Sequence, residues 1–297
     1  MVVLVTGANG QLGQSLQFVA AQYTEMQFVF CSSSDLDITN FENCQTIFNQ
    51  YKPNFCINTA AYTAVDKAES EPEKAFAINV TGAENLAKCC LEHQTVLLHV
   101  STDFVFDAKF SDGKAYYDKE LRLPLQSEKG LLETDVPFPG GMYGLTKLQG
   151  EQAIQAVTDN YFIVRTSWVY SQFGHNFMKT MLRLASERDT LSVVEDQIGT
   201  PTHAVDLANA LLTIIQSRKT DFGIYNFSNE GHCSWYDFAK EIFRINKVVI
   251  DLKPIPSSAY PTPAKRPSYS VLDKTKIKAV FGISIASWET SLLAHQE

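Results

Sequence analysis

The stretch "VVLVTGANGQLG" (residues 2–13) passes directly from an apolar, β-branched run into a turn with three glycines. Strand, glycine turn and helix in this order are typical of a dinucleotide-binding unit. The turn lets the backbone approach a pyrophosphate, and the helix N-terminus supplies free N–H groups and a positive dipole end. Gly7, Gly10 and Gly13 are therefore candidate cofactor-binding residues, with a plain tight turn as the alternative.

Strands and helices are predicted to alternate along most of the chain. Six short runs rich in β-branched residues are separated by longer helical patterns. The runs cover residues 2–6, 27–31, 55–59, 95–100, 161–165 and 223–227. Nearly continuous apolar strands that alternate with helices indicate a parallel sheet covered on both faces. We therefore expect an α/β fold with a doubly wound parallel (Rossmann) sheet.

Two helix starts carry capping signals. Thr39 and Glu42 have the spacing of a capping box at the start of "NFENCQTIFNQY", and Ser234 and Asp237 have it in "SWYDFAKEIF". Aromatic and apolar residues in the second segment recur at helical spacing, which favours core packing.

The alternation becomes irregular after about residue 165. Residues 251–270 hold five prolines and are predicted to be extended or turn backbone. We therefore expect residues 1–166 and 202–227 to form the dinucleotide-binding domain. A smaller C-terminal lobe, built from 167–201 and 228–297, would bind the substrate.

Composition limits the possible partners and the compartment. The 297 residues carry a formal net charge of −8, which argues against binding to nucleic acid. Six cysteines without a C-x-x-C pair are predicted to be reduced core residues. The N-terminus shows no signal-peptide pattern and the chain no membrane span, so we expect a cytoplasmic protein. The histidines, among them His99, lack ligand spacing and are predicted to be packed or surface residues.

A candidate reacting centre lies in two segments. "HVSTDFVFD" follows the fourth strand, so Thr102 and Asp103 fall at the carboxyl edge of the sheet, where ligands bind in such folds. Tyr143 and Lys147 are four apart and share one helix face. An ammonium beside a phenol lowers the pKa of the phenol, which suits proton donation to an alkoxide. Taken alone, Tyr-x-x-x-Lys more often marks a solvated helix face.

The end of the second strand bears on cofactor choice. Ser32, Ser33 and Ser34 stand where an acid usually holds the ribose hydroxyls of NADH. Hydroxyls tolerate a 2′-phosphate, so NADPH is the expected cofactor, and acceptance of NADH stays open. The alternative is a serine-rich turn in which Asp35 or Asp37 is only a local cap.

Nine segments in order cover nearly the whole chain. They are the glycine turn, "STDFVF", "YGLTKLQGE", "VRTSWVY", "NFMKTML", "DQIGTPTHAVDLA", "GIYNFS", "SWYDFAKEIF" and "YPTPAKRPSYSVLD". In these segments the chain resembles the dTDP-4-dehydrorhamnose reductases, a branch of the extended short-chain dehydrogenase/reductases. The resemblance implies NAD(P)H-dependent reduction of the 4-keto group of dTDP-6-deoxy-L-lyxo-4-hexulose, which gives dTDP-L-rhamnose.

The resemblance also implies roles for individual residues. The catalytic residues would be Thr102, Tyr143 and Lys147. The cofactor would be held by Gly7, Gly10, Gln11, Leu12, Gly13, Asp37, Ile38, Ala60, Ala61, Tyr62, Tyr143 and Lys147. The dTDP-keto-sugar would contact Thr102, Asp103, Phe104, Trp168, Lys265 and Arg266.

The chain departs from the family at two places. Residues 109–135 form an enlarged loop whose role the sequence leaves open. Some members form a metal-bridged dimer through an acid in the first helix, where this chain has Gln14 and Ser15. We therefore expect no metal, and either a monomer or a homodimer.

Two rival functions stay open. One is a reductase of another nucleotide-linked keto-sugar, which would share the catalytic residues and differ in the pocket. The other is a non-catalytic NADP-binding subunit of the same fold, resembling the regulatory beta subunit of methionine adenosyltransferase. The intact Thr102, Tyr143 and Lys147 weigh against the second.

Overall fold

A six-stranded, all-parallel sheet forms the centre of the molecule in the computed structural model, which describes residues 1–106, 117–118, 123–124 and 130–295. The strand order is β12-β7-β4-β3-β1-β2. The strands are β1 (Val2–Thr6), β2 (Gln27–Cys31), β3 (Phe55–Asn58), β4 (Val96–Thr102), β7 (Tyr161–Thr166) and β12 (Gly223–Asn226). They coincide with the six predicted runs, so the doubly wound α/β fold is confirmed. The enlarged loop at 109–135 lies largely outside the described residues.

The sheet changes direction at β1. The chain runs from β1 to β2 on one side, and then returns to place β3 on the other side of β1. Thr6 pairs with Cys31 of β2 and with Asn58 of β3, so all three strands end at one level. In such sheets the crevice outside the carboxyl ends at this reversal is the usual ligand site.

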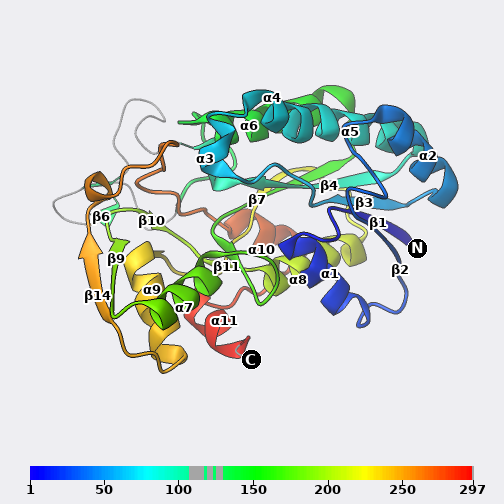
Figure 1. Cartoon of the computed structure of the whole chain (residues 1–297). Helices are drawn as coiled ribbons and strands as arrows, with labels where there is room; N and C mark the ends of the chain where they lie inside the picture. The colour runs from blue at the N-terminus through cyan, green and yellow to red at the C-terminus, as the bar shows by residue number, and fades with distance from the viewer. Residues whose placement is uncertain (107–116, 119–122, 125–129, 296–297) are drawn as a thin grey trace.

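Helices cover both faces of the sheet (Figure 1). Odd and even residues of β1 point to different cores, Val3 and Val5 to one and Leu4 to the other. The first core is closed by α1 (Gln11–Ala20), α8 (Ala204–Ser217) and α10 (Thr275–Phe281), and the second by α2 (Phe41–Tyr51), α5 (Gly82–His93) and α6 (Met142–Val157). Among the described helices, none is long and apolar enough to cross a bilayer.

Local hydrogen bonds decide where α2 and α9 begin. The predicted Thr39–Glu42 box is wrong, because Asn40 is the N-cap of α2 and its Oδ1 accepts from Asn43 N at 3.0 Å. The Thr39 hydroxyl donates to Asp37 instead, at 2.7 Å. The box of Ser234 and Asp237 at the start of α9 (Trp235–Ile245) is confirmed.

The helical stretch before β4 is not uniform. It consists of α4 (Pro72–Phe76), a π-helical turn (Ala77–Thr81) and α5. Such turns are rare and frequently occur at functional sites. Here the turn carries Asn79, whose buried amide bonds Tyr62 and the Thr146 hydroxyl of α6.

A second group of elements, the small lobe, packs around its own apolar core. We define it as α7 (Phe177–Glu187), β9 (Thr190–Val194), α9, β14 (Asp251–Ile255) and α11 (Trp288–Ala294). Four short strands form two separate pairs: β8 (Val169–Tyr170) with β11 (Thr202–His203), and β10 (Ile198–Gly199) with β13 (Cys233–Ser234). The division into two domains stays a prediction. Ile277 and Phe281 of α10 pack in the core beside the sheet, although residues 228–297 were expected in the lobe.

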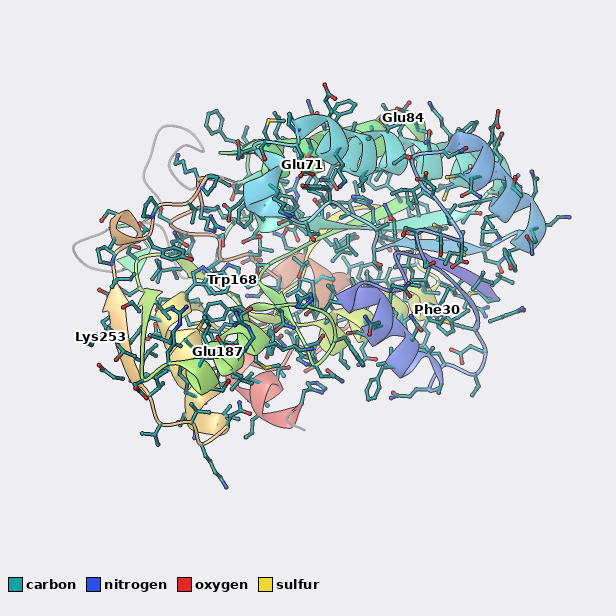
Figure 2. All side chains as sticks on the ribbon, in the orientation of Figure 1. Phe30, Glu71, Glu84, Trp168, Glu187 and Lys253 are labelled. Atoms are coloured by element: carbon teal, nitrogen blue, oxygen red, sulfur yellow. The ribbon has the colours of Figure 1, made fainter. Side chains whose placement is uncertain are left out.

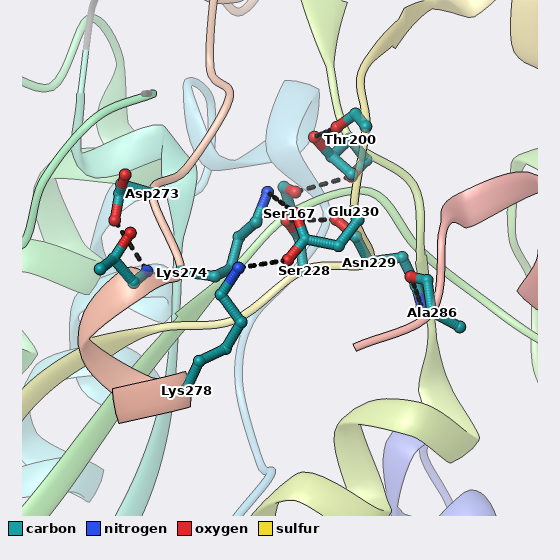
Figure 3. A network of polar contacts seen from close by, with 11 residues as sticks. Ser167, Thr200, Ser228, Asn229, Glu230, Asp273, Lys274, Lys278 and Ala286 are labelled. Atoms are coloured by element: carbon teal, nitrogen blue, oxygen red, sulfur yellow. Dashed lines mark hydrogen bonds and ion pairs between the residues drawn. The ribbon is translucent and has the colours of Figure 1, made fainter. Parts of the chain in front are cut away.

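A polar network follows the end of β12 (Figure 3). Glu230 receives Lys278 Nζ at 2.7 Å and Lys274 Nζ at 3.6 Å. Nearby, the Thr200 hydroxyl donates to Gly231 O at 2.8 Å, and the Ser167 hydroxyl donates to Thr200 O at 2.7 Å. The ion pairs join the loop after β12 to α10, and the two hydroxyl bonds join this loop to Thr200, before β11, and Thr200 to Ser167, before β8.

Candidate active site

The glycine turn lies against β3 at the sheet reversal. Gly7 has φ +66°, and a Cβ there would lie 2.7 Å from Ala60 N, so only glycine fits. Gly10 precedes α1, and its N–H donates to Gly7 O at 2.9 Å. In the described part of the chain no side chain caps α1, so its first N–H groups are open to an anion.

Gln11 and Leu12 begin α1 and have different surroundings. The Gln11 amide donates to Val169 O at 3.0 Å and accepts from Asn176 Nδ2 at 2.7 Å. The side chain of Gln11 therefore links α1 to the segment that enters the small lobe, and its backbone N–H is the group left for a cofactor. Leu12 packs against the core beneath the sheet.

The end of β2 is a compact polar turn. Buried Ser32 donates through both N and Oγ to Asp35, at 2.9 and 2.6 Å, so this carboxylate is occupied locally. Asp37 accepts from Thr39 N and is also a local cap. Ser33 and Ser34 are exposed. The exposed hydroxyls of Ser33 and Ser34 therefore follow β2 directly, and the carboxylates of Asp35 and Asp37 both have hydrogen-bond partners within the turn.

The neighbouring segments support this edge. Ile38 is buried, and a Cβ on Gly82 would lie 2.6 Å from its side chain, so the start of α5 packs directly on it. Ala60, Ala61 and Tyr62 follow β3, and the Tyr62 hydroxyl donates to Glu71 at 2.9 Å.

Helix α6 carries Tyr143 and Lys147 beside the end of β4. The Met142 N–H in its first turn donates to Glu69 at 2.8 Å. A Cβ on Gly144 would lie 2.1 Å from Phe104 O, so the absence of a side chain lets α6 approach the loop after β4. The rings of Phe104 and Tyr143 meet edge to face at 5.5 Å between centroids.

Thr102 and Asp103 form one hydrogen-bonded unit. Thr102 Oγ1 donates to Asp103 Oδ1 at 3.0 Å and accepts from Phe104 N at 3.2 Å. Burial raises the pKa of Asp103 to about 6, against hydrogen bonds from Ser270 and Thr102 that lower it. Asp103 is only 1% exposed, so its carboxyl is poorly placed to contact a sugar. Its observed role is to accept the hydrogen bond from Thr102.

The pKa values of Tyr143 and Lys147 move in opposite directions. Desolvation raises the pKa of Tyr143 to about 12, although a hydrogen bond with Thr102 lowers it. Desolvation lowers the pKa of Lys147 to about 8, opposed by the charge of Glu151. The expected lowering of the phenol pKa by an adjacent ammonium is therefore not found. Burial favours the neutral form of both groups.

The Lys147 amine has two partners that sequence reasoning missed. Its Nζ donates to Val100 O at 2.8 Å and lies 3.1 Å from His99 Nε2. His99 Nδ1 in turn lies 3.0 Å from Asn58 Nδ2. The prediction that His99 is a packed residue is right, but nothing in its spacing indicated contact with Lys147, 48 residues away.

Trp168 lies between the sheet and the small lobe (Figure 2). Its indole stacks on Trp235 with centroids 3.5 Å apart and planes within 8°. The residue has φ +45°, a conformation uncommon outside glycine and frequent at functional sites. The ring is thus held in one position at the edge of the lobe.

Lys265 and Arg266 lie on a pocket of ≈ 320 Å³ that Tyr260, Thr262 and Ser268 also line. Arg266 forms a bidentate ion pair with Asp66 of α3 (Val65–Ala68), at 3.0 and 2.8 Å. This pair could not be predicted from the sequence, because its partners are 200 residues apart. Within the described residues, no cluster of His, Cys, Asp or Glu is arranged to hold a metal ion.

A glycine turn at the sheet reversal, together with Thr102 at the end of β4 and with Tyr143 and Lys147 on α6, defines a Rossmann-type protein of the short-chain dehydrogenase/reductase class. The family described as the RmlD substrate binding domain matches residues 1–296. A dTDP-4-dehydrorhamnose reductase of Aggregatibacter actinomycetemcomitans is 41% identical over 98% of this chain and 96% of its own.

Solved structures agree. A dTDP-4-dehydrorhamnose reductase of Clostridium acetobutylicum has a TM-score of 0.89 at 39% identity, over 99% of this chain and 98% of its own. The enzyme of Bacillus anthracis, in complex with NADP, has a TM-score of 0.89 at 36% identity, with the same coverage. The chain belongs to the RmlD substrate binding domain family.

Proposed function

We infer that the protein reduces the 4-keto group of dTDP-6-deoxy-L-lyxo-4-hexulose to the alcohol of dTDP-L-rhamnose, with NADPH as the reductant. The observation that carries this inference is the position of Tyr143, on α6, beside Thr102 at the end of β4 and close to the sheet reversal. Relatives that the chain matches over nearly its full length are named dTDP-4-dehydrorhamnose reductase. One relative has been solved with NADP.

The glycine turn fits a dinucleotide. Gly7 leaves the space that a Cβ would fill, and the first N–H groups of α1 are open, which suits a pyrophosphate. The backbone of Gly10, Gln11, Leu12 and Gly13 would hold the pyrophosphate, and Asp37 and Ile38 would hold the adenine end. Ala60, Ala61, Tyr62, Tyr143 and Lys147 would line the path to the reacting end. When bound, NADPH supplies the hydride.

Tyr143 is the proposed proton donor. Because its pKa is raised to about 12, the phenol is protonated at neutral pH and can give its proton to the oxygen of the reduced ketone. Thr102 would orient the phenol, and Lys147 would contact the cofactor ribose and return a proton to the Tyr143 phenolate. The protein gains rate by orientation and by exclusion of water, since both groups lie in a desolvated site.

The sugar nucleotide would bind between the sheet and the small lobe. One face of the Trp168 indole is covered by Trp235, so the part of the ring that stays accessible would meet the sugar, with Phe104 packed against Tyr143 nearby. Lys265 and Arg266 would meet the diphosphate. Three of the five Arg266 N–H groups bond Asp66 and Ala264 in the described structure, which leaves two for ligand oxygens.

Three further proposals concern the oligomeric state, the cellular compartment and the domain division. We propose a monomer or a homodimer without a metal bridge, because Ser15, in the part of α1 where a bridging acid would stand, is buried and donates to Gln11 O. Six buried, free cysteines suit a reducing compartment such as the cytoplasm. We also propose the division into a dinucleotide-binding domain and a substrate-binding lobe.

The direct test is NADPH oxidation on addition of the dTDP-keto-sugar, with the product identified by NMR. Stoichiometric dTDP-L-rhamnose is the expected result. NADP binding without turnover would favour the regulatory subunit, and turnover only with a different nucleotide sugar would favour the related reductase.

Cofactor preference tests the β2 end. With Asp35 and Asp37 hydrogen-bonded within their own turn, neither carboxylate is left to accept from the ribose hydroxyls of NADH, so NADPH should have at least the kcat/KM of NADH. We expect a modest preference, since neutral hydrogen bonds contribute only about 0.5–1.5 kcal/mol each. A tenfold or greater preference for NADH in steady-state kinetics would refute this assignment.

A further inference from the structure

A loop at the entrance to the small lobe lies against α1, the helix that follows the glycine turn. Residues 171–176, here called the lobe loop, lead from β8 into α7. The backbone of Gly174 comes so close to α1 that a Cβ there would lie 3.3 Å from Gln11 Cβ. The rings of Phe173 and Phe18 meet with centroids 6.0 Å apart. The helix at the cofactor turn and the entrance to the lobe are therefore in direct contact.

The amide of Gln11 makes the polar part of this contact. Its Nε2 donates to Val169 O at 3.0 Å, and its Oε1 accepts from Asn176 Nδ2 at 2.7 Å. A carbonyl can only accept, so the NH₂ end of Gln11 must face Val169. The Lys179 N–H can only donate, and it donates to Asn176 Oδ1 at 3.1 Å, so the NH₂ end of Asn176 must face Gln11. Both amides therefore have one defined orientation.

Asn176 passes this contact on to the lobe. It is the N-cap of α7, and its Nδ2 also donates to Ser171 O at 2.6 Å. The Phe173 N–H donates to Ser171 Oγ at 3.1 Å, which closes the lobe loop on itself. The position of Gln11 therefore bears on the start of α7 as well as on the loop.

The other partner of Gln11 is the carbonyl of the residue that follows Trp168. The Trp168 carbonyl accepts from Thr202 N at 3.2 Å, and one face of its indole is covered by Trp235. A Cβ on Gly199 would lie 2.5 Å from the same indole. Because the ring is packed this closely, a shift of the backbone at Val169 would displace the part of the indole that stays accessible.

Gln11 thus has two groups with different uses. As the first residue of α1 it offers a backbone N–H where the helix is open to a pyrophosphate. We propose that Gln11 is a positioning residue for the sugar site, with its side chain holding the Trp168 segment and the start of α7 while its backbone N–H serves the cofactor. The inference rests on the proposed function, because it takes Trp168 as a contact of the sugar.

This arrangement couples the two ligands. A pyrophosphate on the first turn of α1 restrains the main chain of Gln11, and the restrained amide then restrains residues 168–176. Such coupling is reciprocal, so a sugar nucleotide that orders residues 168–176 also favours the cofactor-bound form of the turn.

Gln11→Met tests the side chain alone, because it keeps an unbranched chain of similar length and the backbone N–H. Hydrogen exchange of the full chain, saturated with NADP, is followed by mass spectrometry. We expect residues 168–176 to exchange about 3- to 10-fold faster than in wild type, the effect of a lost neutral hydrogen bond. NADP affinity, measured by calorimetry, should stay close to that of wild type.

Gln17→Met is the matched control on the same helix. Its amide donates to Ala8 O at 2.7 Å, within the glycine turn, and has no bond to the lobe among the described residues. Exchange of residues 168–176 should be that of wild type in this variant. If Gln11→Met leaves this exchange unchanged, or if it weakens NADP binding instead, the proposal is wrong.

Asn176→Asp cuts the same link from the other side. Aspartate still caps α7 by accepting from Lys179 N, but it places an oxygen where a donor faced Gln11 Oε1. Residues 168–176 should exchange faster, while the remainder of α7 exchanges as in wild type. Faster exchange confined to α7 would reveal a cap without a link and would overturn the proposal.

Steady-state kinetics with the dTDP-keto-sugar complete the test. Gln11→Met should raise the substrate KM about 3- to 10-fold and leave the KM of NADPH in place, whereas Gln17→Met should not change the substrate KM. Exchange that changes without a change in substrate KM would refute the role at the sugar site. Because exchange is read without turnover, the expected exchange in a protein that does not reduce the sugar would count against the proposed function alone.

Discussion

Tyr143 and Lys147 lie one turn apart on α6, and exclusion of water disfavours the charged form of each. The pKa of the phenol rises to about 12 and the pKa of the amine falls to about 8. A phenol that stays protonated is a ready proton donor. An amine that titrates near neutral pH can exchange protons during turnover.

Lys147→Met removes the amine while keeping much of the side-chain volume. We expect turnover to fall on the order of 10²-fold or more, with weaker NADPH binding and a changed pH profile, measured by steady-state kinetics and calorimetry. An unaltered pH profile with normal NADPH affinity would mean that Lys147 has no part in the reaction.

Lys147 also makes stability depend on pH. Its pKa is about 8 when folded and near 10.5 when unfolded, so between these values the unfolded chain binds more protons. The free energy of unfolding attributable to Lys147 therefore rises with pH across this window. The stability difference between wild type and Lys147→Met, followed by urea titration, should change in that direction from about pH 8 to pH 10.

The elements place these residues through close contacts. Helix α6 approaches the loop after β4 because Gly144 has no side chain, and the π-helical turn brings Asn79 against Thr146. The glycine turn, Thr102 and the Tyr143–Lys147 spacing could be found from the sequence because each is a local pattern. His99, Asn58 and Asn79 could not, since their partners are distant along the chain and only the folded sheet joins them.

Gly144→Ala tests the approach of α6. The new Cβ would lie 2.1 Å from Phe104 O, so helix and loop must separate. We expect a loss of about 1–3 kcal/mol in the free energy of unfolding, and a larger fall in turnover than in NADPH affinity. Gln152→Ala, at an exposed position of the same helix, is the control. Wild-type turnover and stability in Gly144→Ala would contradict the contact.

At the scale of the whole molecule, Asp66 and Arg266 join the edge of the sheet to the proline-rich segment that leads out of the small lobe. The two residues are 200 positions apart in the sequence, and their ion pair is partly exposed. Arg266 is expected to bind the diphosphate, but the pair with Asp66 gives it a second, purely structural explanation.

Substitution of each partner separates these explanations. If Arg266 binds the diphosphate, Arg266→Ala should raise the substrate KM roughly 10- to 150-fold, the value of a charge-assisted bond, and Asp66→Asn should change it far less. NADPH affinity should be unchanged in both. If both variants and the double variant change the substrate KM equally, Arg266 serves only to hold the ion pair with Asp66.

The role of Tyr143 is tested most directly by single-turnover reduction of the dTDP-keto-sugar by wild type and Tyr143→Phe, with NADPH affinity measured in parallel. The variant keeps the ring against Phe104 and loses only the hydroxyl. We predict that the rate of the chemical step falls on the order of 10²–10⁴-fold while NADPH affinity is unchanged. A variant that reduces the sugar at the wild-type rate would contradict Tyr143 as the proton donor.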